Sequence, residues 1–214
     1  MINTSDIRLE KIAWFKNCEL MQNETHLTIQ KFLFFYEMFS KVLGKQTDLD
    51  YLRAYPNGPV FSNTYGDITY RSSEFENKVN SIKDFPNVDE DIARAASSLV
   101  KTFTDTELSE FTHQFDLWKS KEDLIDKQRN ISIDEEDITS KDLKKFELLY
   151  EEYSEFSNQD YVTFQLLDKI FIIESQDYDM LSEEHRQIIE ILSNDSTLEN
   201  PVYLELEEGV LLID

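Results

Sequence analysis

Histidine and cysteine, the residue types most often used to bind metals or to act as nucleophiles, are rare in this chain. His26, His113 and His185 are its only histidines, and Cys18 is its only cysteine. No histidine lies three or four residues from another or from Cys18, so the spacing of a zinc site is absent. We therefore expect neither a metal nor a cofactor, and we interpret His113 as a structural residue and not a catalytic one.

Carboxylates are so abundant, at 44 Asp and Glu residues, that no single pair stands out as a general acid and base. The densest run, from Asp134 to Asp137, lacks the alternating ligands and the turn glycine of a calcium loop, and we interpret it as a helix start. Neither a Walker motif nor a dinucleotide fingerprint occurs, and Ser109 and Ser182 lack the context of a nucleophile elbow. The sequence therefore predicts a protein that is not an enzyme.

The negative charge is large and uneven along the chain. The 44 acidic and 21 basic residues give a formal net charge of −23, and residues 134–214 contribute −18 of it, with 23 acids against 5 bases. Such a field repels nucleic-acid phosphates and anionic lipids and attracts basic proteins. We therefore expect a protein partner with a basic surface, and no direct contact with nucleic acid or membrane. A merely solvated acidic surface is the alternative interpretation.

The sequence also predicts a cytoplasmic location. One cysteine cannot form an intramolecular disulfide, and the first ten residues carry Asp6 and Glu10 where a signal peptide needs a basic end and an apolar run. The richest apolar stretch, from Ile29 to Leu43, is interrupted by charges and is shorter than the roughly 20 apolar residues that span a bilayer. We expect no membrane span.

The elements that must position these residues are mostly helices, because 4 Gly and 4 Pro in 214 residues leave few tight turns. Helix starts are predicted at Ser5, at Thr28, at Ser73 and at two capping boxes, Asn87 to Glu90 and Thr104 to Glu107. We expect the first helix to reach about Met21, the second to stop at Gly44, and the acidic run at 134–137 to begin a helix towards Phe156. Residues 45–72 are expected to form an irregular connection with a short helix through Val60, Phe61 and Tyr65.

The last third of the chain has a different pattern of apolar and polar residues. The run from Val162 to Ile173 is compatible with a strand or a buried helix, since its periodicity does not separate the two. Ser182 is expected to cap a helix, and residues 202–213 to form a hairpin that turns at 207–209. The prediction is therefore a mainly α protein. A multi-helix globular domain at 1–157 would carry a smaller acidic α+β extension at 158–214, packed on it and ending in a β-hairpin.

Three motifs give the chain a resemblance to a known family. They are Ile29-Gln30-Lys31-Phe32-Leu33-Phe34-Phe35, then Arg53-Ala54-Tyr55-Pro56-Asn57-Gly58-Pro59-Val60 with Tyr65, and Leu108-Ser109-Glu110-Phe111-Thr112-His113 with Trp118. In this order, and with the terminal pattern at Ile133 to Ile138, they resemble the Panacea antitoxin domain, also called SocA-like, of phage-associated bacterial proteins. The resemblance covers roughly residues 5–147. Phe34 stands where the family usually has tyrosine, and Tyr55 and Pro56 where it often has tryptophan or a basic residue.

The resemblance implies a helical domain that neutralises a protein toxin encoded nearby, or that delivers a toxin to a protease. The candidate structural or partner-binding residues are those of the motifs: Lys31, Phe34, Phe35, Gly58, Pro59, Val60, Tyr65, His113 and Trp118. Phe34 and Phe35 are interpreted as core residues, and as partner contacts if they are exposed. The charge excess also permits a second hypothesis, a phage-type DNA mimic or decoy whose carboxylates occupy a nucleic-acid-binding enzyme.

Overall fold

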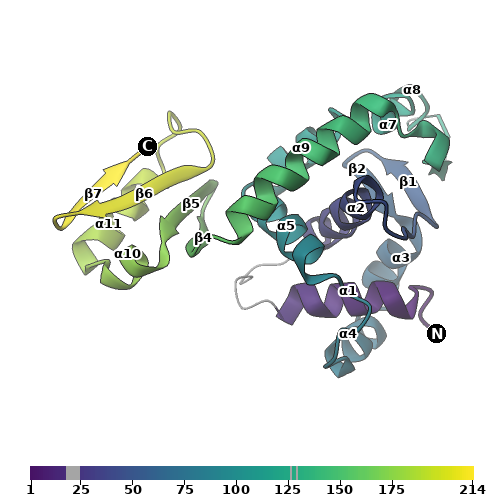
Figure 1. Cartoon of the computed structure of the whole chain (residues 1–214), viewed down its shortest axis with the longest axis horizontal. Helices are drawn as coiled ribbons and strands as arrows, with labels where there is room; N and C mark the ends of the chain where they lie inside the picture. The colour runs from purple at the N-terminus through teal and green to yellow at the C-terminus, as the bar shows by residue number, and fades with distance from the viewer. Residues whose placement is uncertain (18–24, 126, 129) are drawn as a thin grey trace.

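In the computed structural model, which describes residues 1–17, 25–125, 127–128 and 130–214, the chain forms two lobes with separate hydrophobic cores (Figure 1). The N-terminal lobe, up to residue 157, is mainly helical, and the C-terminal lobe, residues 158–214, combines a small sheet with helices. The predicted fold class is confirmed at this level. None of the helices in the described part of the chain is both long and apolar enough to cross a membrane.

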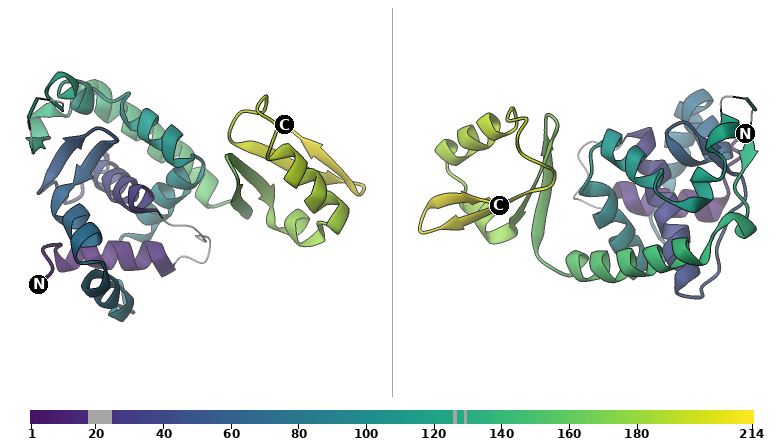
Figure 2. Two further views of the ribbon diagram at one scale, coloured as in Figure 1. Left: turned by 180° about the vertical axis from the view of Figure 1, so that it is seen from behind. Right: turned by 90° about the horizontal axis from the view of Figure 1, so that it is seen from above.

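The N-terminal lobe places three short strands among its helices. In chain order its elements are α1 (Asp6–Asn17), α2 (His26–Val42), β1 (Leu52–Tyr55), β2 (Gly58–Phe61), α3 (Ser62–Tyr70), α4 (Ser72–Ser81), α5 (Glu90–Lys101), α6 (Asp105–Thr112), α7 (Asp116–Lys119), α8 (Glu122–Ile125), β3 (Ile131–Ser132), the 3-10 helix η1 (Glu135–Asp137) and α9 (Ser140–Ser157). The long α9 runs along one side of this lobe and leads into the C-terminal lobe (Figures 1 and 2).

Helix α2 forms the centre of the N-terminal lobe because its apolar side chains surround it on almost every side. It packs against α1, α3, α5, α6, α9 and β2. Phe32, Phe34, Phe35 and Phe39 are all completely buried. Full burial of one such side chain stabilises the fold by about 1.5–3 kcal/mol. The expectation that this helix lies in the middle of the lobe is confirmed.

Two helix starts differ from the sequence prediction. Thr25, and not Thr28, caps α2: its hydroxyl accepts the Thr28 N–H at 3.1 Å, while the Thr28 hydroxyl accepts the Thr25 N–H at 2.9 Å. Asp89, and not Asn87, caps α5 through the Ile92 N–H. In both cases a second capping-type residue lies within three positions, and packing selects between them. The capping boxes that start at Thr104 and Ser182 form as predicted.

Three further expectations concern helix ends. The acidic run forms only η1, and α9 begins at Ser140 with Thr139 as its cap, because the extended residue Ile138 separates the two. Gly44 follows the end of α2 with a φ of +67°, as its predicted role as helix stop requires. The predicted end of the first helix, about Met21, and Cys18 lie outside the described residues.

The connection at 45–72 is more regular than predicted. Val60 and Phe61 belong to strand β2, and the helix that follows begins only at Ser62. Strands β1 and β2 form an antiparallel hairpin that pairs Leu52 with Phe61 and Tyr55 with Gly58, and β3 pairs with the other edge of β1. The pattern did not indicate this hairpin because its strands have four residues each and β2 contains a proline.

The C-terminal lobe has one four-stranded sheet in the order β4-β5-β6-β7. Its elements are β4 (Tyr161–Leu166), β5 (Lys169–Glu174), α10 (Ser175–Met180), α11 (Glu183–Leu192), β6 (Val202–Glu207) and β7 (Val210–Ile213). The run at 162–173, which was compatible with strand or helix, therefore forms a β-hairpin. Strands β5 and β6 are parallel, and α10 and α11 lie in the crossover between them. Phe171, Ile173 and Ile189 contribute to the core that joins helices and sheet.

Strands β6 and β7 form the closing hairpin, with Glu207 paired to Val210. Glu208 and Gly209 form the two-residue turn, with φ values of +51° and +81°. Two successive left-handed residues give the type of turn that matches the twist of an antiparallel pair. Figures 1 and 2 show this hairpin at the end of the molecule farthest from the N-terminal lobe.

Candidate partner-binding surface

Side chains from two helices hold the tip of the β1–β2 hairpin by its backbone. The Trp118 indole Nε1 on α7 donates a hydrogen bond to the Tyr55 carbonyl at 2.9 Å. The Lys31 amine on α2 donates to the carbonyls of Asn57, at 2.5 Å, and Pro59, at 3.3 Å. Residues far apart in the sequence thus converge on one turn, which leaves the turn little conformational freedom.

His113 supports this arrangement from the side. Its ring stacks on the Trp118 ring, with centroids 3.8 Å apart and planes 16° from parallel. Burial lowers the pKa of His113, and the positive charge of Lys31 lowers it further, while the Pro56 carbonyl opposes this effect. In the described residues, the buried Nε2 of His113 has no hydrogen-bond partner. We interpret the imidazole as a flat packing surface for Trp118, in keeping with its predicted structural role.

No carboxylate of the described residues pairs with the Lys31 amine. Its side chain is completely buried, and within the described part of the chain its amine bonds only to backbone carbonyls. Burial lowers the pKa of Lys31 to about 7 because desolvation disfavours the charged amine. The amine contributes by tying the hairpin to the central helix, whether it is charged or neutral.

Gly58 is the position at the tip that only glycine fits. Its φ is +93°, in the region that L side chains avoid. A Cβ there would collide with the Thr112 hydroxyl and with the Lys31 amine. The backbone must therefore approach α2 and α6 closely, and this approach places the carbonyls next to Lys31. Pro59 and Val60 follow in β2 and are buried.

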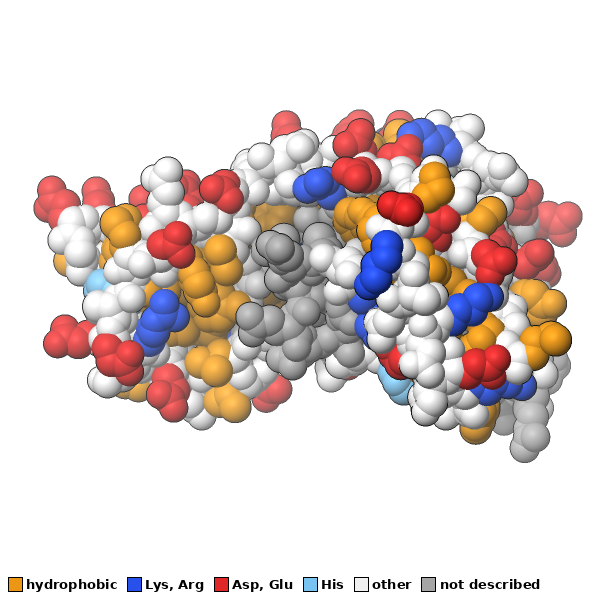
Figure 3. Space-filling model, turned by 90° about the horizontal axis from the view of Figure 1, so that it is seen from below, with side chains coloured by type: hydrophobic (Ala, Val, Ile, Leu, Met, Phe, Trp, Pro, Cys, Tyr) orange, Lys and Arg blue, Asp and Glu red, His pale blue; other side chains and the backbone are white. Residues whose placement is uncertain are grey.

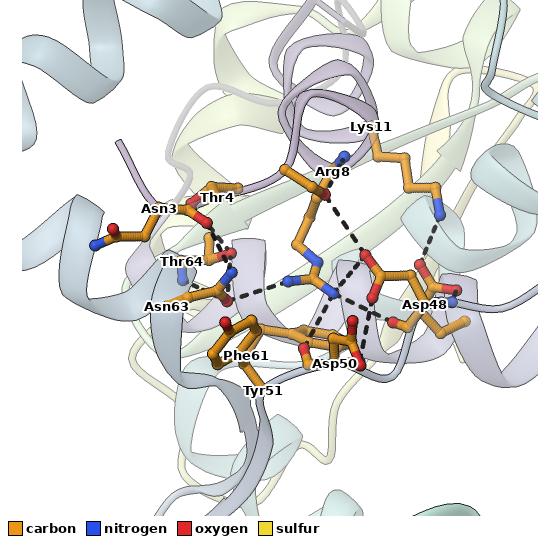
Figure 4. A network of polar contacts seen from close by, with 12 residues as sticks. Asn3, Thr4, Arg8, Lys11, Asp48, Asp50, Tyr51, Phe61, Asn63 and Thr64 are labelled. Carbon is orange, nitrogen blue, oxygen red and sulfur yellow. Dashed lines mark hydrogen bonds and ion pairs between the residues drawn. The ribbon is translucent and has the colours of Figure 1, made fainter. Parts of the chain in front are cut away.

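The base of the hairpin is held by a buried guanidinium on α1 (Figure 4). Arg8 is 1% exposed and lies over the Phe61 ring, with its Cζ 4.2 Å from the centroid. It donates to the Asn63 side chain at 3.1 Å and to the Asp50 carbonyl at 3.2 Å, and it pairs with the Asp48 carboxylate at 2.8 Å. These partners precede β1 and follow β2, so Arg8 joins both ends of the hairpin.

A second buried pair extends this network towards α2. The Lys11 amine pairs with the Glu37 carboxylate at 2.6 Å and lies over the Tyr36 ring at 4.2 Å. The other Glu37 oxygen accepts the Asp48 N–H at 2.8 Å. This second bond gives the carboxylate a partner outside the pair, although burial still raises the pKa of Glu37. The network fixes the chain that enters β1 against two helices.

One tyrosine of this hairpin, Tyr55, lies near two tyrosines of α3. The rings of Tyr55, on β1, and Tyr65, on α3, have centroids 5.6 Å apart. Tyr70, at the end of α3, is 80% exposed. Burial raises the pKa of Tyr55, and the electrostatic influence of Tyr65 and Tyr70 raises it further. We call Tyr55, Tyr65 and Tyr70 the tyrosine surface.

The structure thus brings most of the predicted site residues together. Lys31, Gly58, Pro59, His113 and Trp118 meet at the hairpin tip. Tyr65 belongs to the tyrosine surface, and Val60 lies in the strand behind it.

Phe34 and Phe35 are completely buried and contact Phe115 and Phe146, so they support the site from the core and do not form its surface. Sequence reasoning missed Arg8 and Tyr70, and it named Thr112 only as a member of the third motif. The sequence pattern does not show their roles, because these depend on residues far along the chain.

A separate cavity lies between the two lobes. It has a volume of about 770 Å³ and is lined by residues of α2, α5, α6, β4 and β5. Several of its polar groups have structural partners: Glu107 closes the capping box of Thr104 and accepts the Asn200 amide at 2.9 Å, and the Lys169 amine donates to the Leu198 carbonyl. These contacts join the lobes and cap helices.

The hairpin region provides a fixed surface that can contact another molecule. In the described residues no group of three or more His, Cys, Asp or Glu side chains is arranged to hold a metal ion. Lys31 and Trp118 bind the backbone of the hairpin, and of the three tyrosines Tyr70 is exposed while Tyr55 and Tyr65 are half-buried. No protein-family model matches this chain, and neither does any curated protein or solved structure.

Proposed function

We propose that this protein is an antitoxin-like binding protein that docks a protein toxin on the tyrosine surface of its N-terminal lobe. The observation that supports the proposal most is a hairpin anchored at its base by Arg8 and at its tip by Lys31 and Trp118, where the rings of Tyr55 and Tyr65 are in contact. The resemblance of the three motifs to an antitoxin domain supplies the kind of partner.

The physical reasons favour a contact surface of this type. Tyrosine offers a large apolar ring and a polar hydroxyl, and it loses little conformational entropy when it is immobilised, so it is enriched among the residues that dominate interface energetics. A surface that is already rigid avoids much of the ordering cost of association. The anchors of the hairpin therefore act on binding indirectly, by keeping the tyrosines in place.

The acidic C-terminal lobe fits the same proposal as a steering device. Residues 158–214 carry 14 acids and 2 bases, a net charge of −12. A field of this kind raises the association rate of a basic partner by about tenfold or more at low salt. On the face that Figure 3 shows, Lys and Arg side chains are interspersed with acids over the N-terminal lobe, whereas acids prevail around the C-terminal lobe. A second version of the proposal is an adaptor that delivers the bound toxin to a protease.

The same acid surplus supports one other candidate, a DNA mimic that occupies a nucleic-acid-binding enzyme. Because residues 1–157 carry 19 bases against 30 acids, mimicry would be confined to the C-terminal lobe. Its binding would weaken steeply with salt and would not depend on the tyrosines. Salt dependence together with tyrosine dependence therefore separates the two functions.

The test is co-expression of the chain with the product of the neighbouring gene, read as growth rescue and as co-purification. The Tyr65→Ala/Tyr70→Ala double variant is expected to weaken binding about 100-fold, since truncation of each interface tyrosine costs about 1–2 kcal/mol. Leu148→Ala, at a residue on α9 that is 55% exposed, is the matched control and should bind normally. Circular dichroism confirms folding of both variants.

Two results would contradict the proposal at different points. If the wild type neither rescues growth nor co-purifies, the antitoxin-like function is wrong. If the wild type binds and the double variant binds equally well, the function stands and the assignment of the tyrosine surface fails.

A further inference from the structure

The outer edge of strand β7 is open. The four strands of the sheet end at β7, and no strand in the described residues pairs with its outer side. Tyr203 and Asp214 exchange both backbone hydrogen bonds, so the alternation of an antiparallel ladder turns the N–H and C=O groups of Leu211 and Ile213 outward. Four backbone groups are thus directed away from the sheet, in the arrangement that an added strand would use.

The side chains of this edge are unusual for an exposed strand. All four residues of β7 are apolar, and Val210, Leu212 and Ile213 are 59%, 40% and 42% exposed. Open edges in monomeric proteins are commonly protected by lysine, proline or a bulge. None of these devices occurs between residues 210 and 213, so the strand itself does not prevent another chain from pairing with it.

A groove lies next to this edge on the face of the sheet opposite α11. It has a volume of about 570 Å³ and is lined in part by Tyr161, Tyr203, Glu174, Glu205 and Asp214. The register places these five on one face, because Tyr161 pairs with Glu174, Tyr203 with Asp214, and Glu205 with the exposed Leu212. Aromatic rings and carboxylates therefore surround one hollow, which is the environment that a guanidinium or ammonium group prefers.

Charge decides which strand can be added. The lobe carries 14 acids against 2 bases, so a second copy of this chain would bring the same negative field against β7 and would be repelled. Both bases are also engaged, since the Lys169 amine donates to the Leu198 carbonyl and Arg186 lies over the Tyr178 ring at 5.3 Å. A basic segment gains the attraction that a second copy lacks.

We propose that the C-terminal lobe binds an extended basic segment of a partner protein by β-strand addition to β7. An arginine or lysine of that segment lies in the groove over Tyr203, between Glu205 and Asp214. Backbone bonds to Leu211 and Ile213 provide affinity, and the groove selects a cation at alternate positions of the segment. This activity goes beyond the proposed function and does not depend on the tyrosine surface of the N-terminal lobe.

The test measures fluorescence anisotropy of a labelled peptide of six alternating arginine and valine residues with the full chain. Strand addition requires the N–H groups of the peptide. A version of equal charge, N-methylated at the positions that face β7, is therefore expected to bind about tenfold or more weakly. A glutamate–valine peptide should not bind. Raising the salt concentration weakens both arginine peptides and leaves the ratio of their affinities largely unchanged.

Protein variants locate the site. Tyr203→Ala and Glu205→Gln are each expected to weaken the arginine–valine peptide severalfold to tenfold. Glu184→Gln, on α11, removes the same charge from the helical side of the lobe and should change the affinity less than twofold. Leu211→Pro removes an outward N–H that the sheet does not use, and should weaken the arginine–valine peptide but not its N-methylated version.

Three outcomes would overturn the inference. The first is that the arginine–valine peptide does not bind at low salt. The second is equal binding of the methylated peptide together with equal effects of Glu205→Gln and Glu184→Gln, which would reduce the interaction to general charge attraction. The third is a dimer, measured by light scattering, that Leu211→Pro dissociates, because β7 would then be a self-interface. No toxin enters this assay, so its failure leaves the proposed function untouched.

Discussion

Replacing Lys31 by methionine tests how this buried amine is held. Methionine has a similar length and no charge, so it fills the space between α2 and the hairpin while removing the donor to Asn57 and Pro59. In the wild type, burial lowers the pKa of Lys31 to about 7 from an ordinary value of 10.5. Between these two values the unfolded chain holds a proton that the folded chain has released.

The direction and size of the effect follow from this difference. Because the unfolded state binds more protons between about pH 7 and 10, the unfolding free energy of the wild type rises with pH in this window, by at most about 1.4 kcal/mol per pH unit. Integrated from pH 7 to pH 10, the rise is about 3–4 kcal/mol. Below pH 7 both states carry the proton, and the contribution of this lysine levels off. The Lys31→Met variant lacks this pH-dependent contribution to the unfolding free energy, because methionine does not titrate.

The assay is urea unfolding of both proteins at pH 6, 7, 8, 9 and 10, followed by the fluorescence of the buried Trp14 and Trp118. The difference between wild type and variant is the quantity to compare, because the titration of groups that do not interact with Lys31 cancels in it. Lys119→Met, at an exposed lysine on α7, is the matched control and should show no such slope. A difference that stays constant from pH 7 to pH 10 would refute the reasoning, since the folded amine would then titrate like an ordinary lysine.

The remaining predictions concern the two anchors of the hairpin and use the same unfolding assay at pH 7. Gly58→Ala is expected to lower the unfolding free energy by about 2–4 kcal/mol. The strain of a left-handed φ and the collision of the new Cβ with Lys31 and Thr112 each destabilise the folded state, and the two costs add. Gly44→Ala, at a φ of +67° with open space around it, should lower the unfolding free energy by only about 1 kcal/mol. Equal losses of unfolding free energy at the two glycines would contradict the close approach of the Gly58 backbone to Lys31 and Thr112. Arg8→Met is expected to cost about 3–5 kcal/mol because it leaves Asp48 and two carbonyls without their donor. Arg94→Met, which breaks only the exposed pair with Glu90, should stay within about 0.5 kcal/mol, and a similar value for Arg8→Met would show that the network contributes little.

A common feature of these predictions is that the hairpin is positioned by side chains that reach it from helices. Its two strands have four residues each, and an isolated two-stranded hairpin is at best marginally stable in water. The donors from Arg8, Lys31 and Trp118 supply what the strands lack. The position of the tyrosine surface therefore depends on the helical core. Under the proposed function, variants of the anchors should weaken toxin binding although the anchors themselves do not contact the toxin.

Several elements could be predicted from local sequence alone. The phenylalanine pattern of α2 indicated a helix that is apolar on nearly all sides, and such a helix must lie in the middle of its lobe. The capping boxes at Thr104 and Ser182 marked two helix starts, because the groups that satisfy each other are only three residues apart. The same local rule placed two other caps at the wrong residue, Thr28 for Thr25 and Asn87 for Asp89, where neighbouring side chains could serve equally well.

The sequence by itself determined the helical character, the central helix and the concentration of negative charge in the last third, since these depend on composition and on spacings of a few residues. Only the tertiary structure decided that Lys31, Gly58 and Trp118 meet at one turn, that Arg8 joins the two ends of a hairpin, and that β7 is left as an open edge. The physical reason is the distance along the chain: Lys31 is 26 residues from Asn57, and Trp118 is 63 residues from Tyr55. Contacts of that range form only when packing of the whole core brings the segments together, and no local propensity encodes them.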